Sequence, residues 1–514
     1  MSRVTRILFL VFFSFVSGLS ARDGVIPRPL RMESAGRALI LLDGMASIVC
    51  ADPELARTAG AVIHKHTGLY LDAGKRPAEG SRLVIYIDPA NTSVEAKALG
   101  PEGYLLDIAG GRGAKVPAVI IRSIGRAGAF YGLQTLMHLL RVGKGGEIHL
   151  SPTRVVDKPR FAWRGLFLNG ELCFLDKKSI KHLLDLMAFY KLNVLHWRLA
   201  GDEMWRLEVK RYPGLTPVGR ECYYTQADVR EIVAYAAARQ IRVVPALSLP
   251  IHDYTLDGKV SPAAAMPKNN ERTVSAILEE LCALFPSPYL HVETIFSLRD
   301  DLGRFPMDGN SAVSRNRLFI NDLKMKASAV VKNILLEKNR RNMTWEDRNY
   351  LLAYSMDAKA SDAENAADVG VVRYQDVAFL KRRLSRGVPV VVAPDFYLRF
   401  DYMAEKKPTR HSGARQDFSF LKYVYEFPGA LGVSSGTMLG GYEALCFPEK
   451  NFSLAKVESM LFPRVLVLAE LCWTSGELCV WENFRRRLPE AVRRLEFLQV
   501  NYCKDNLSTP SQTE

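Results

Sequence analysis

From residue 161 onward, hydrophobic and polar positions repeat in one order: a short apolar run, a polar loop and an amphipathic stretch. Short apolar runs bounded by turn residues are typical of buried parallel strands, and apolar positions three and four apart predict helices. The alternation predicts a (β/α)8 TIM barrel of the α/β class over residues 159–505. The predicted strands lie at 163–168, 193–199, 241–248, 289–293, 342–345, 369–374, 388–393 and 437–442, with helices at 178–190, 226–239 and 273–285.

The residues before the barrel, 21–158, carry a shorter pattern of the same two kinds. We therefore predict a small N-terminal α/β domain ahead of the barrel. Its predicted strands lie at 83–87, 104–108 and 118–121, and its predicted helix at 128–140. Residues 454–473 and 483–498 are predicted to be helices that cover the barrel, and 506–514 form a polar tail.

The first 20 residues are patterned differently. Arg3 and Arg6 precede an apolar run at 7–16, and Gly18, Leu19 and Ser20 supply small residues before Ala21. This order predicts a secretory signal peptide and a secreted or periplasmic protein. No Cys follows the run, which argues against a lipoprotein anchor, and no second apolar run is long enough to predict a membrane span.

Composition narrows the class of partner. Apolar residues make up 48% and charged residues 24% of the chain, as in globular proteins. The net charge of +14 fits either a polyanion-binding surface or Lys and Arg side chains spread over the molecule. We favour spread-out charge and expect no nucleic-acid partner. The eight cysteines form no CxxC pair, so we expect no metal site and no cofactor, and their disulfide pairing stays open.

Chemistry-bearing residues follow the predicted barrel strands. The strand at 193–199 ends in a polar loop that carries Asp202 and Glu203. In barrels of this class, the loops after the carboxyl ends of the strands form the active-site mouth. We therefore place the candidate site at that end of the predicted barrel.

The segment at 196–216, HWRLAGDEMWRLEVKRYPGLT, closely resembles the second-strand segment of glycoside hydrolase family 20, the β-N-acetylhexosaminidases. The resemblance runs from about residue 101 to residue 502. It implies a hexosaminidase-type N-terminal domain that braces the barrel. Further matching residues are Arg164-Gly165, 187–197, 224–226, 462–464 and Ala469-Glu470.

The resemblance also implies a particular chemistry. In this family the substrate's own acetamido oxygen attacks the anomeric carbon, while an Asp stabilises that group and the adjacent Glu acts as general acid and base. The pair follows a His-x-Gly-Gly sequence at the fourth strand. Here the aligned residues are HVETIF from His291, so Ile295 and Phe296 occupy the Asp-Glu positions. Neither side chain carries a proton or a charge, so the resemblance implies a scaffold that lacks the catalytic pair.

At several other positions where the family has sugar-binding residues, this chain also has different residues. Asn169 and Leu172 stand where the family has an Asp and a sugar-gripping Arg. Arg399 replaces a Tyr that contacts the acetamido group, and Cys446 stands in the position of a Trp. We expect a smaller and more apolar mouth than in an active enzyme, with Leu172 and Cys446 pointing into it beside the two residues at the catalytic positions.

Some site residues remain. The retained histidines have two interpretations, sugar contact or hydrogen-bonded packing at strand ends, and we favour packing. For Trp345 two interpretations stay equally open: its ring stacks against a sugar, or it packs in the hydrophobic core. The candidates for residual sugar binding are Asp202, His252, His291, Trp345, Tyr374 and Asp401.

Three functions stay open for this fold. The first is a catalytically impaired pseudoenzyme that binds glycans containing N-acetylhexosamine, or a partner protein. The second is an active β-N-acetylhexosaminidase with relocated carboxylates, for which Glu293, Asp300 and Asp301 are weak substitutes. The third is a structural partner of an active relative. We favour the first, because a displaced acid on a longer loop rarely keeps hydrogen-bond reach of the glycosidic oxygen.

Overall fold

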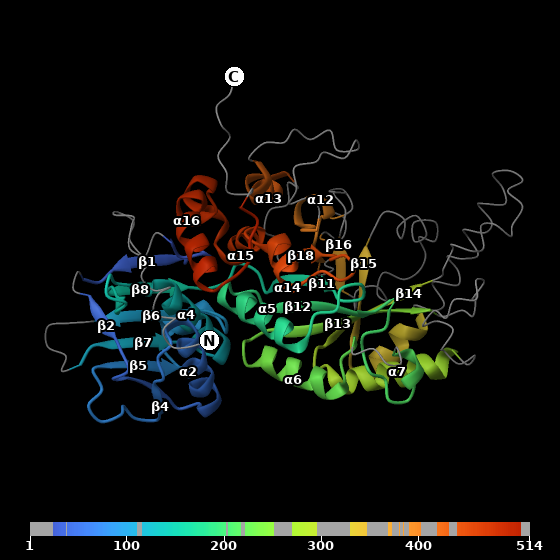
Figure 1. The fold of residues 1–514 in the computed structure, drawn as a ribbon, viewed down its shortest axis with the longest axis horizontal. Coiled ribbons are helices and arrows are strands. Elements are labelled where there is room, and N and C mark those ends of the chain that lie inside the picture. The colour runs from blue at the N-terminus through green and yellow to red at the C-terminus, as the bar shows by residue number, and fades with distance from the viewer. Residues whose placement is uncertain are drawn as a thin grey trace, which may run out of the picture.

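An eight-stranded parallel barrel forms the C-terminal part of the molecule (Figure 1). Its strands follow chain order around the ring, and the last strand closes it by pairing in parallel with the first. The predicted (β/α)8 barrel is thus confirmed. The strands are β11 (Trp163–Asn169), β12 (Val194–Ala200), β13 (Arg242–Pro250), β14 (Tyr289–Ile295), β15 (Arg341–Glu346), β16 (Val369–Val372), β17 (Val390–Val392) and β18 (Leu439–Cys446).

The computed structural model of the chain describes residues 24–36, 39–109, 116–201, 204–216, 222–250, 270–295, 329–346, 369–372, 380, 384, 390–401, 419–430 and 439–504. Among these residues, no helix is both long and apolar enough to cross a membrane.

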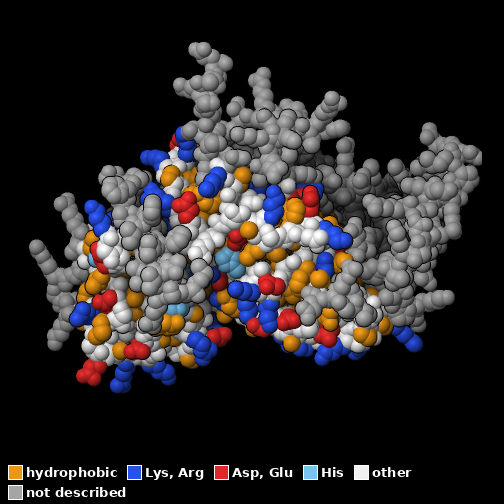
Figure 2. All heavy atoms as spheres, viewed as in Figure 1, with side chains coloured by type: hydrophobic (Ala, Val, Ile, Leu, Met, Phe, Trp, Pro, Cys, Tyr) orange, Lys and Arg blue, Asp and Glu red, His pale blue; other side chains and the backbone are white. Residues whose placement is uncertain are grey.

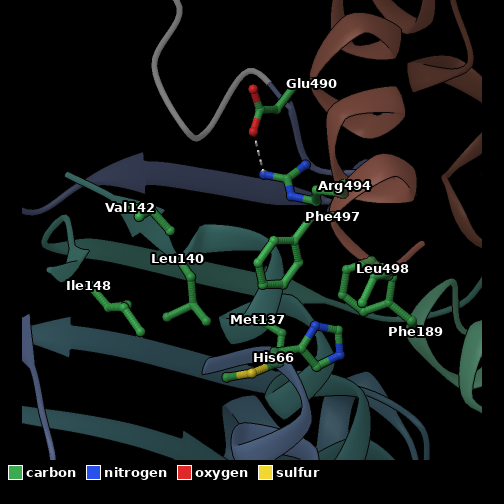
Figure 3. A pocket seen from close by; sticks show the side chains of 10 residues that line it. All are labelled: His66, Met137, Leu140, Val142, Ile148, Phe189, Glu490, Arg494, Phe497 and Leu498. Carbon is green, nitrogen blue, oxygen red and sulfur yellow. Dashed lines mark ion pairs between the residues drawn. The ribbon is translucent and has the colours of Figure 1, made fainter. Parts of the chain in front are cut away.

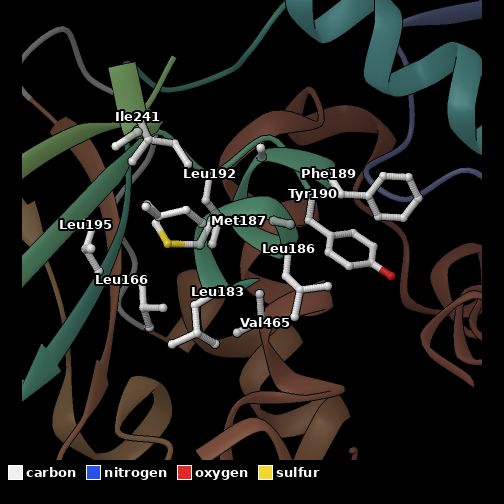
Figure 4. Packing of buried hydrophobic residues seen from close by; sticks show 14 of the residues in the cluster. Leu166, Leu183, Leu186, Met187, Phe189, Tyr190, Leu192, Leu195, Ile241 and Val465 are labelled. Atoms are coloured by element: carbon white, nitrogen blue, oxygen red, sulfur yellow. The ribbon is translucent and has the colours of Figure 1, made fainter. Parts of the chain in front are cut away.

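Helices pack around the outside of the barrel. The helix α5 (Lys177–Phe189) begins where the Asp176 side chain accepts a hydrogen bond from the Ser179 amide at 2.8 Å. Its apolar face, which includes Leu183 and Met187, joins Leu166 and Leu195 of the barrel strands in one buried cluster (Figure 4). Further helices here are α6 (Gln226–Ala237), α7 (Asn270–Leu284), α12 (Asp395–Leu398), α13 (Ser419–Ala430), α14 (Leu454–Leu461), α15 (Arg464–Trp473) and α16 (Trp481–Phe497), and residues 329–337 are also helical.

The C-terminal helical segment differs from its prediction in one respect. Residues 454–473 were expected to form one helix, but α14 ends at Leu461 and α15 begins at Arg464. Pro463 separates them, and it has no backbone N–H to continue the hydrogen-bond ladder. Proline also disfavours helical backbone at the residue before it, and Phe462 is extended, with φ −101° and ψ 140°.

Along β11, β12, β13, β17 and β18, side chains alternate between two hydrophobic clusters. On β12, Val194 belongs to the cluster inside the barrel, whereas Leu195 and Trp197 belong to the cluster between the strands and the helices. The inner cluster also contains Trp163 and Phe167 of β11. This alternation determines which polar side chains can reach the barrel mouth.

The N-terminal part contains a seven-stranded mixed sheet in the order β1-β10-β6-β7-β5-β3-β4. The predicted strands at 83–87, 104–108 and 118–121 are present as three of these strands, and α4 (Arg126–Leu139) matches the predicted helix. The three predicted strands are β5 (Leu83–Asp88), β6 (Tyr104–Ala109) and β7 (Ala118–Arg122). The elements that were not predicted are β1 (Arg31–Ser34), β2 (Ile40–Leu42), β3 (Ala46–Cys50), α2 (Pro53–Thr67), β4 (Asp72–Gly74), α3 (Val94–Leu99), β8 (Arg141–Val142), β9 (Ile148–Leu150) and β10 (Thr153–Asp157).

A buried ion pair ties this sheet to the barrel. Lys191, at the start of the loop between α5 and β12, donates to Asp157 Oδ2 at 3.0 Å, and the two side chains are 0% and 1% exposed. The same oxygen accepts from Tyr104 Oη at 2.6 Å and from Trp473 Nε1 at 2.9 Å. One carboxylate thereby joins β6, β10, the barrel and α15, so we expect the sheet and barrel to unfold together.

Two histidines lie in the seam between α2, α4 and the barrel helices. The rings of His66 and His138 stack on Phe189 of α5, with centroids 4.8 Å and 3.9 Å away. His66 also lines a cavity of about 50 Å³ beside the Glu490–Arg494 ion pair of α16 (Figure 3). Burial lowers the pKa of His66 from 6.5 to about 3 and holds the pKa of His138 well below 6.5.

These depressed pKa values predict loss of stability in mild acid. Below pH 6.5 the unfolded chain binds protons that the folded histidines do not, so the free energy of unfolding should fall as pH falls. The slope should reach up to about 1.4 kcal/mol per pH unit for each histidine between pH 6.5 and 5. Urea unfolding at several pH values measures it. His66→Leu should flatten the slope, and a slope left unchanged by this substitution would contradict the assignment.

Candidate functional site

The candidate site lies at the carboxyl end of the barrel strands, where a group of charged side chains meets. Arg198 comes from β12, Ser248 from β13 and Glu293 from β14, while Glu171 follows β11. These residues belong to four consecutive strands or the loop directly after one, so closure of the barrel brings them together. We call these four residues the mouth network.

Arg198 is the centre of the mouth network. Its Nε donates to Glu171 Oε2 at 3.0 Å, and its Nη1 donates to Glu293 Oε2 at 3.1 Å. Its Nη2 donates to Ser248 Oγ at 2.7 Å, and that hydroxyl donates to Glu293 Oε2 at 3.1 Å. The Arg198, Glu171 and Glu293 side chains are 17%, 8% and 29% exposed, so Glu293 is the member that solvent reaches most.

Close packing around Glu171 shows that the chain is built to accommodate it. A Cβ atom on Gly201 would lie 2.0 Å from Glu171 Oε2, which no side chain could tolerate without displacing the carboxylate. On the other side, Arg206 donates to the Glu171 carbonyl oxygen at 2.9 Å and fixes the loop backbone. Glu171 is therefore held against Arg198 from two directions.

A second polar chain lies deeper in the barrel. Glu443 of β18 contacts His196 of β12, with 2.8 Å between Oε1 and Nδ1, and accepts from Trp163 Nε1 through Oε2 at 3.0 Å. His196 Nε2 lies 2.9 Å from Nδ1 of His291 on β14. His291 Nε2 is 3.8 Å from Glu293 Oε1, so this chain reaches the mouth network. Within the described residues, no three His, Cys, Asp or Glu side chains are placed to hold a metal ion.

Aromatic rings line the same end of the barrel. Trp345 of β15, which is 8% exposed, packs edge-on against Phe167 and His291, with ring centroids 5.1 Å and 4.9 Å away. Phe447, just after β18, is half-buried and lies 5.1 Å from the Phe167 ring. The Arg399 guanidinium sits 4.8 Å above the Phe447 ring.

The predicted site residues fall into two groups. The structure brings His291, Glu293 and Trp345 together inside the barrel, with Asp401 nearby, where it pairs with Arg399 and accepts a hydrogen bond from the Phe447 amide at 3.4 Å. Ile295 ends β14, but its side chain lies outside the described set. The residues outside the described ranges are Asp202, His252, Phe296, Asp300, Asp301 and Tyr374.

One predicted position is wrong by one residue. Cys446 was expected to point into the mouth, but it is fully buried in the cluster between the strands and the helices. The alternation on β18 places Leu445 inside the barrel and Cys446 outside, and Phe447 packs against the inner cluster. Burial raises the pKa of the Cys446 thiol well above its usual value, so it stays neutral. Phe447 is therefore the aromatic side chain at this edge of the mouth.

The expectation of a more apolar mouth rests mainly on Ile295 and Phe296, whose side chains lie outside the described residues. In its described part, the mouth holds an arginine and two glutamates in a hydrogen-bonded group. The sequence reasoning overlooked Arg198 and Glu171. A signal was present for Arg198, because it stands two residues after His196 in an otherwise apolar strand and so faces the same side. Glu171, in an irregular turn, offered no such signal.

Removing Arg198 should cost stability. In Arg198→Met, two partly buried carboxylates would lose their cation, so the free energy of unfolding should fall by about 2–3 kcal/mol. Urea denaturation measures the loss. Adding Glu293→Gln to that variant should restore part of it, because one uncompensated charge is removed. If Arg198→Met costs less than about 0.5 kcal/mol, the network does not stabilise the mouth.

Comparison with known proteins decides the family. The model of the glycosyl hydrolase family 20 catalytic domain matches residues 161–273 and 258–476, and the model of domain 2 of that family matches residues 23–158. The chain belongs to glycosyl hydrolase family 20. The resemblance seen in the strand segments is therefore confirmed at the level of the family.

Relatives of this family 20 chain carry related names. A Porphyromonas gingivalis protein named Beta-hexosaminidase is 26% identical over 93% of the chain. The chain spans only 64% of that relative's length. A solved β-N-acetylhexosaminidase from Bacteroides fragilis covers 95% of this chain and 99% of its own, with a TM-score of 0.74 at 20% identity. A Vibrio harveyi exo β-N-acetylglucosaminidase in complex with N-acetylglucosamine covers 95% and 79%, with a TM-score of 0.72 at 20% identity.

Proposed function

We propose that this family 20 chain binds glycans containing N-acetylhexosamine at its barrel mouth and does not hydrolyse them at a useful rate. The observation that carries the proposal is that both carboxylates of the mouth network form ion pairs within the protein. Glu171 and Glu293, the two carboxylates of the mouth network, both pair with Arg198. From the sequence alone, we place Ile295 and Phe296 at the family's Asp-Glu positions.

A general acid must place a protonated oxygen within hydrogen-bond distance of the glycosidic oxygen. Glu293 is poorly suited to this role, because Oε2 already accepts hydrogen bonds from Arg198 and Ser248 and Oε1 faces His291. Glu171 is more deeply buried and bonded to the same guanidinium. This arrangement favours a non-hydrolytic site over relocated carboxylates.

Binding a sugar requires fewer precisely placed groups than hydrolysing it. A sugar ring requires an apolar face to stack on and a few polar groups for its hydroxyls. Half-buried Phe447 would supply the first through the part of its ring that Arg399 does not cover, while the exposed part of Glu293 and the Asp401 carboxylate would supply the second. The V. harveyi neighbour of this fold is complexed with N-acetylglucosamine, which makes that sugar the first ligand to try.

Spread-out surface charge fits a glycan better than a polyanion. Figure 2 shows Lys and Arg side chains interspersed with Asp and Glu over the visible face, with no single basic surface. The high net charge of +14 therefore supplies no separate evidence for nucleic-acid binding. Export, inferred from residues 1–20, would bring the mouth to extracellular or periplasmic glycans.

Calorimetric titration with N-acetylglucosamine tests the proposal. We expect saturable binding, and Phe447→Ala should raise the dissociation constant about two- to tenfold because a stacked ring is worth roughly 0.5–1.5 kcal/mol. Tyr70→Ala is the matched control, since Tyr70 is an 80% exposed aromatic of the N-terminal part. Equal weakening by both changes, or no binding by the wild type to this sugar or to N-acetylgalactosamine, would overturn the proposal.

A further inference from the structure

Residues 24–30 run along α15, α16 and the end of β10 before the chain enters β1. We call this segment the strap. Residues 24–27 are buried, and Val25 and Ile26, which are 1% and 0% exposed, belong to the hydrophobic cluster that also holds residues of α4 and α16. The strap belongs to no strand and no α-helix, so its buried backbone groups need partners elsewhere.

Two buried arginines of α16 hold the first part of the strap. Arg494 Nη1 donates to the Gly24 carbonyl at 2.6 Å, and Arg487 Nη1 donates to the Val25 carbonyl at 2.9 Å. The Arg494 and Arg487 side chains are 9% and 6% exposed. Hydrogen bonds from a guanidinium are stronger than those between neutral groups. Both bonds go to carbonyl oxygens, so the arginines recognise the path of the backbone.

Two buried carboxylates and a hydroxyl hold the second part. The Arg28 amide donates to Glu470 Oε2 at 2.8 Å, and the Leu30 amide donates to Asp157 Oδ1 at 3.1 Å. The Arg28 carbonyl accepts from Thr474 Oγ1 at 2.9 Å. Donors and acceptors of the strap backbone are thus both matched by side chains. The residues that bind it, which we call the strap site, are Asp157, Glu470, Thr474, Arg487 and Arg494.

The strap site is held together by contacts that do not involve the strap. Arg487 also forms an ion pair with Glu470, with 3.1 Å between Nη1 and Oε2. Arg494 lies 3.4 Å from Glu490, and Asp157 keeps the buried lysine described above. If the strap left, none of these charges would lose its counter-ion, so the penalty for an unpaired buried charge would not arise. The site is therefore preformed.

The first position of the strap has no room for a side chain. A Cβ atom on Gly24 would overlap Cγ of Glu490 and lie 2.7 Å from its Cβ, which is attached directly to the backbone of α16. Glu490 is held in place by its ion pair with Arg494, beside the seam cavity (Figure 3). The strap site therefore selects glycine at this position by size.

We propose that the strap site is a peptide-binding site whose resident occupant is the strap, and that the strap opens and closes as a unit while the rest of the molecule stays folded. A segment that can leave without unpairing buried charges opens at a lower free energy than the whole domain unfolds. Gly24 and Arg494 are 470 positions apart in the chain, so the site is complete only after α16 has folded. An open site accepts a second peptide of the same kind, with glycine followed by two aliphatic residues.

A peptide titration tests the proposal. In full-length Ile26→Asp, a carboxylate at a fully buried position should expel the strap and leave the site empty. The probe is acetyl-GVIPRPL with a fluorophore at its carboxyl end, followed by anisotropy. We expect the variant to bind it at least about tenfold more tightly than the wild type, whose site is filled. The matched peptide acetyl-VVIPRPL should bind the variant at least about tenfold more weakly, because valine would overlap Glu490.

Arginine variants control for charge. Added to Ile26→Asp, Arg494→Met should weaken binding of acetyl-GVIPRPL, whereas Arg485→Met should not. Arg485 is 53% exposed and pairs with Glu482 on the same helix, away from the strap site. An Ile26→Asp protein that binds neither peptide, or binds both equally, would overturn the proposal.

Amide hydrogen exchange of the wild type decides if Ile26→Asp fails to fold. In peptic fragments, the Arg28 and Leu30 amides should exchange together and at least about tenfold faster than the amides of α16. Exchange of the strap only at the rate of α16 would overturn the proposal. No sugar enters either experiment, so a failure to bind N-acetylglucosamine would count against the proposed function and leave this inference standing.

Discussion

Replacing Asp157 by alanine should lower the free energy of unfolding by about 3–5 kcal/mol, because it leaves a buried cation without its partner. Lys191 is fully buried, and burial lowers its pKa, which shows that the ammonium is poorly solvated there. The change also removes the acceptor of the Tyr104 hydroxyl and the Trp473 indole. Chemical denaturation followed by tryptophan fluorescence measures the loss.

A surface ion pair provides the control for that result. Arg154 and Glu95 lie 3.0 Å apart, and each side chain is 50% exposed. Glu95→Ala should therefore cost less than about 1 kcal/mol. Asp157→Asn with Lys191→Met should cost less than Asp157→Ala, since it removes both charges. A loss below about 1.5 kcal/mol for Asp157→Ala would show that the pair does not hold the two parts together.

The second large effect concerns catalysis. We expect turnover of aryl N-acetylglucosaminides and N-acetylgalactosaminides at least about 10²–10⁴-fold below that of an active relative, since the general acid alone accounts for that much. The predicted absence of the stabilising Asp should lower the rate further, though not additively. A chromogenic assay beside the P. gingivalis relative named Beta-hexosaminidase measures the difference.

Carboxylate variants control this assay. Glu293→Gln and Asp300→Asn should leave the rate at background, because neither residue is expected to act as the acid. Turnover comparable to that of the relative, lost in either variant, would instead establish a relocated carboxylate. Since Glu293 is bonded to Arg198, an active Glu293 would also require that ion pair to open.

The barrel was predictable from sequence because its signal is local and repeated. Buried parallel strands are nearly continuous apolar runs, so β11 and β12 were placed within one residue at each end. The strand β18 was placed less well, at 437–442 instead of Leu439–Cys446. Gly440, Gly441 and the buried Glu443 interrupt its apolar run. Because β18 ends later than predicted, Cys446 is its last residue. The alternation of side chains along the strand then places Cys446 outside the barrel.

The mouth network could not be predicted, because no local pattern connects its members. Glu171 and Glu293 are far apart in the chain and share a cation only after the barrel closes. The charge on each was visible in the sequence, but its partner was not. Short, half-exposed strands such as β1 and β10 were missed for a related reason, since their pairing across the sheet outweighs a weak local preference.

The central claim is binding without hydrolysis, and one measurement addresses both halves. Chitobiose, the β-linked dimer of N-acetylglucosamine, is incubated with the protein, and one NMR sample reports saturation transfer to the sugar together with its anomeric signals over several days. The account predicts saturation transfer with the dimer intact, and reduced transfer in Phe447→Ala. Release of N-acetylglucosamine monomer at a rate proportional to protein concentration would contradict it.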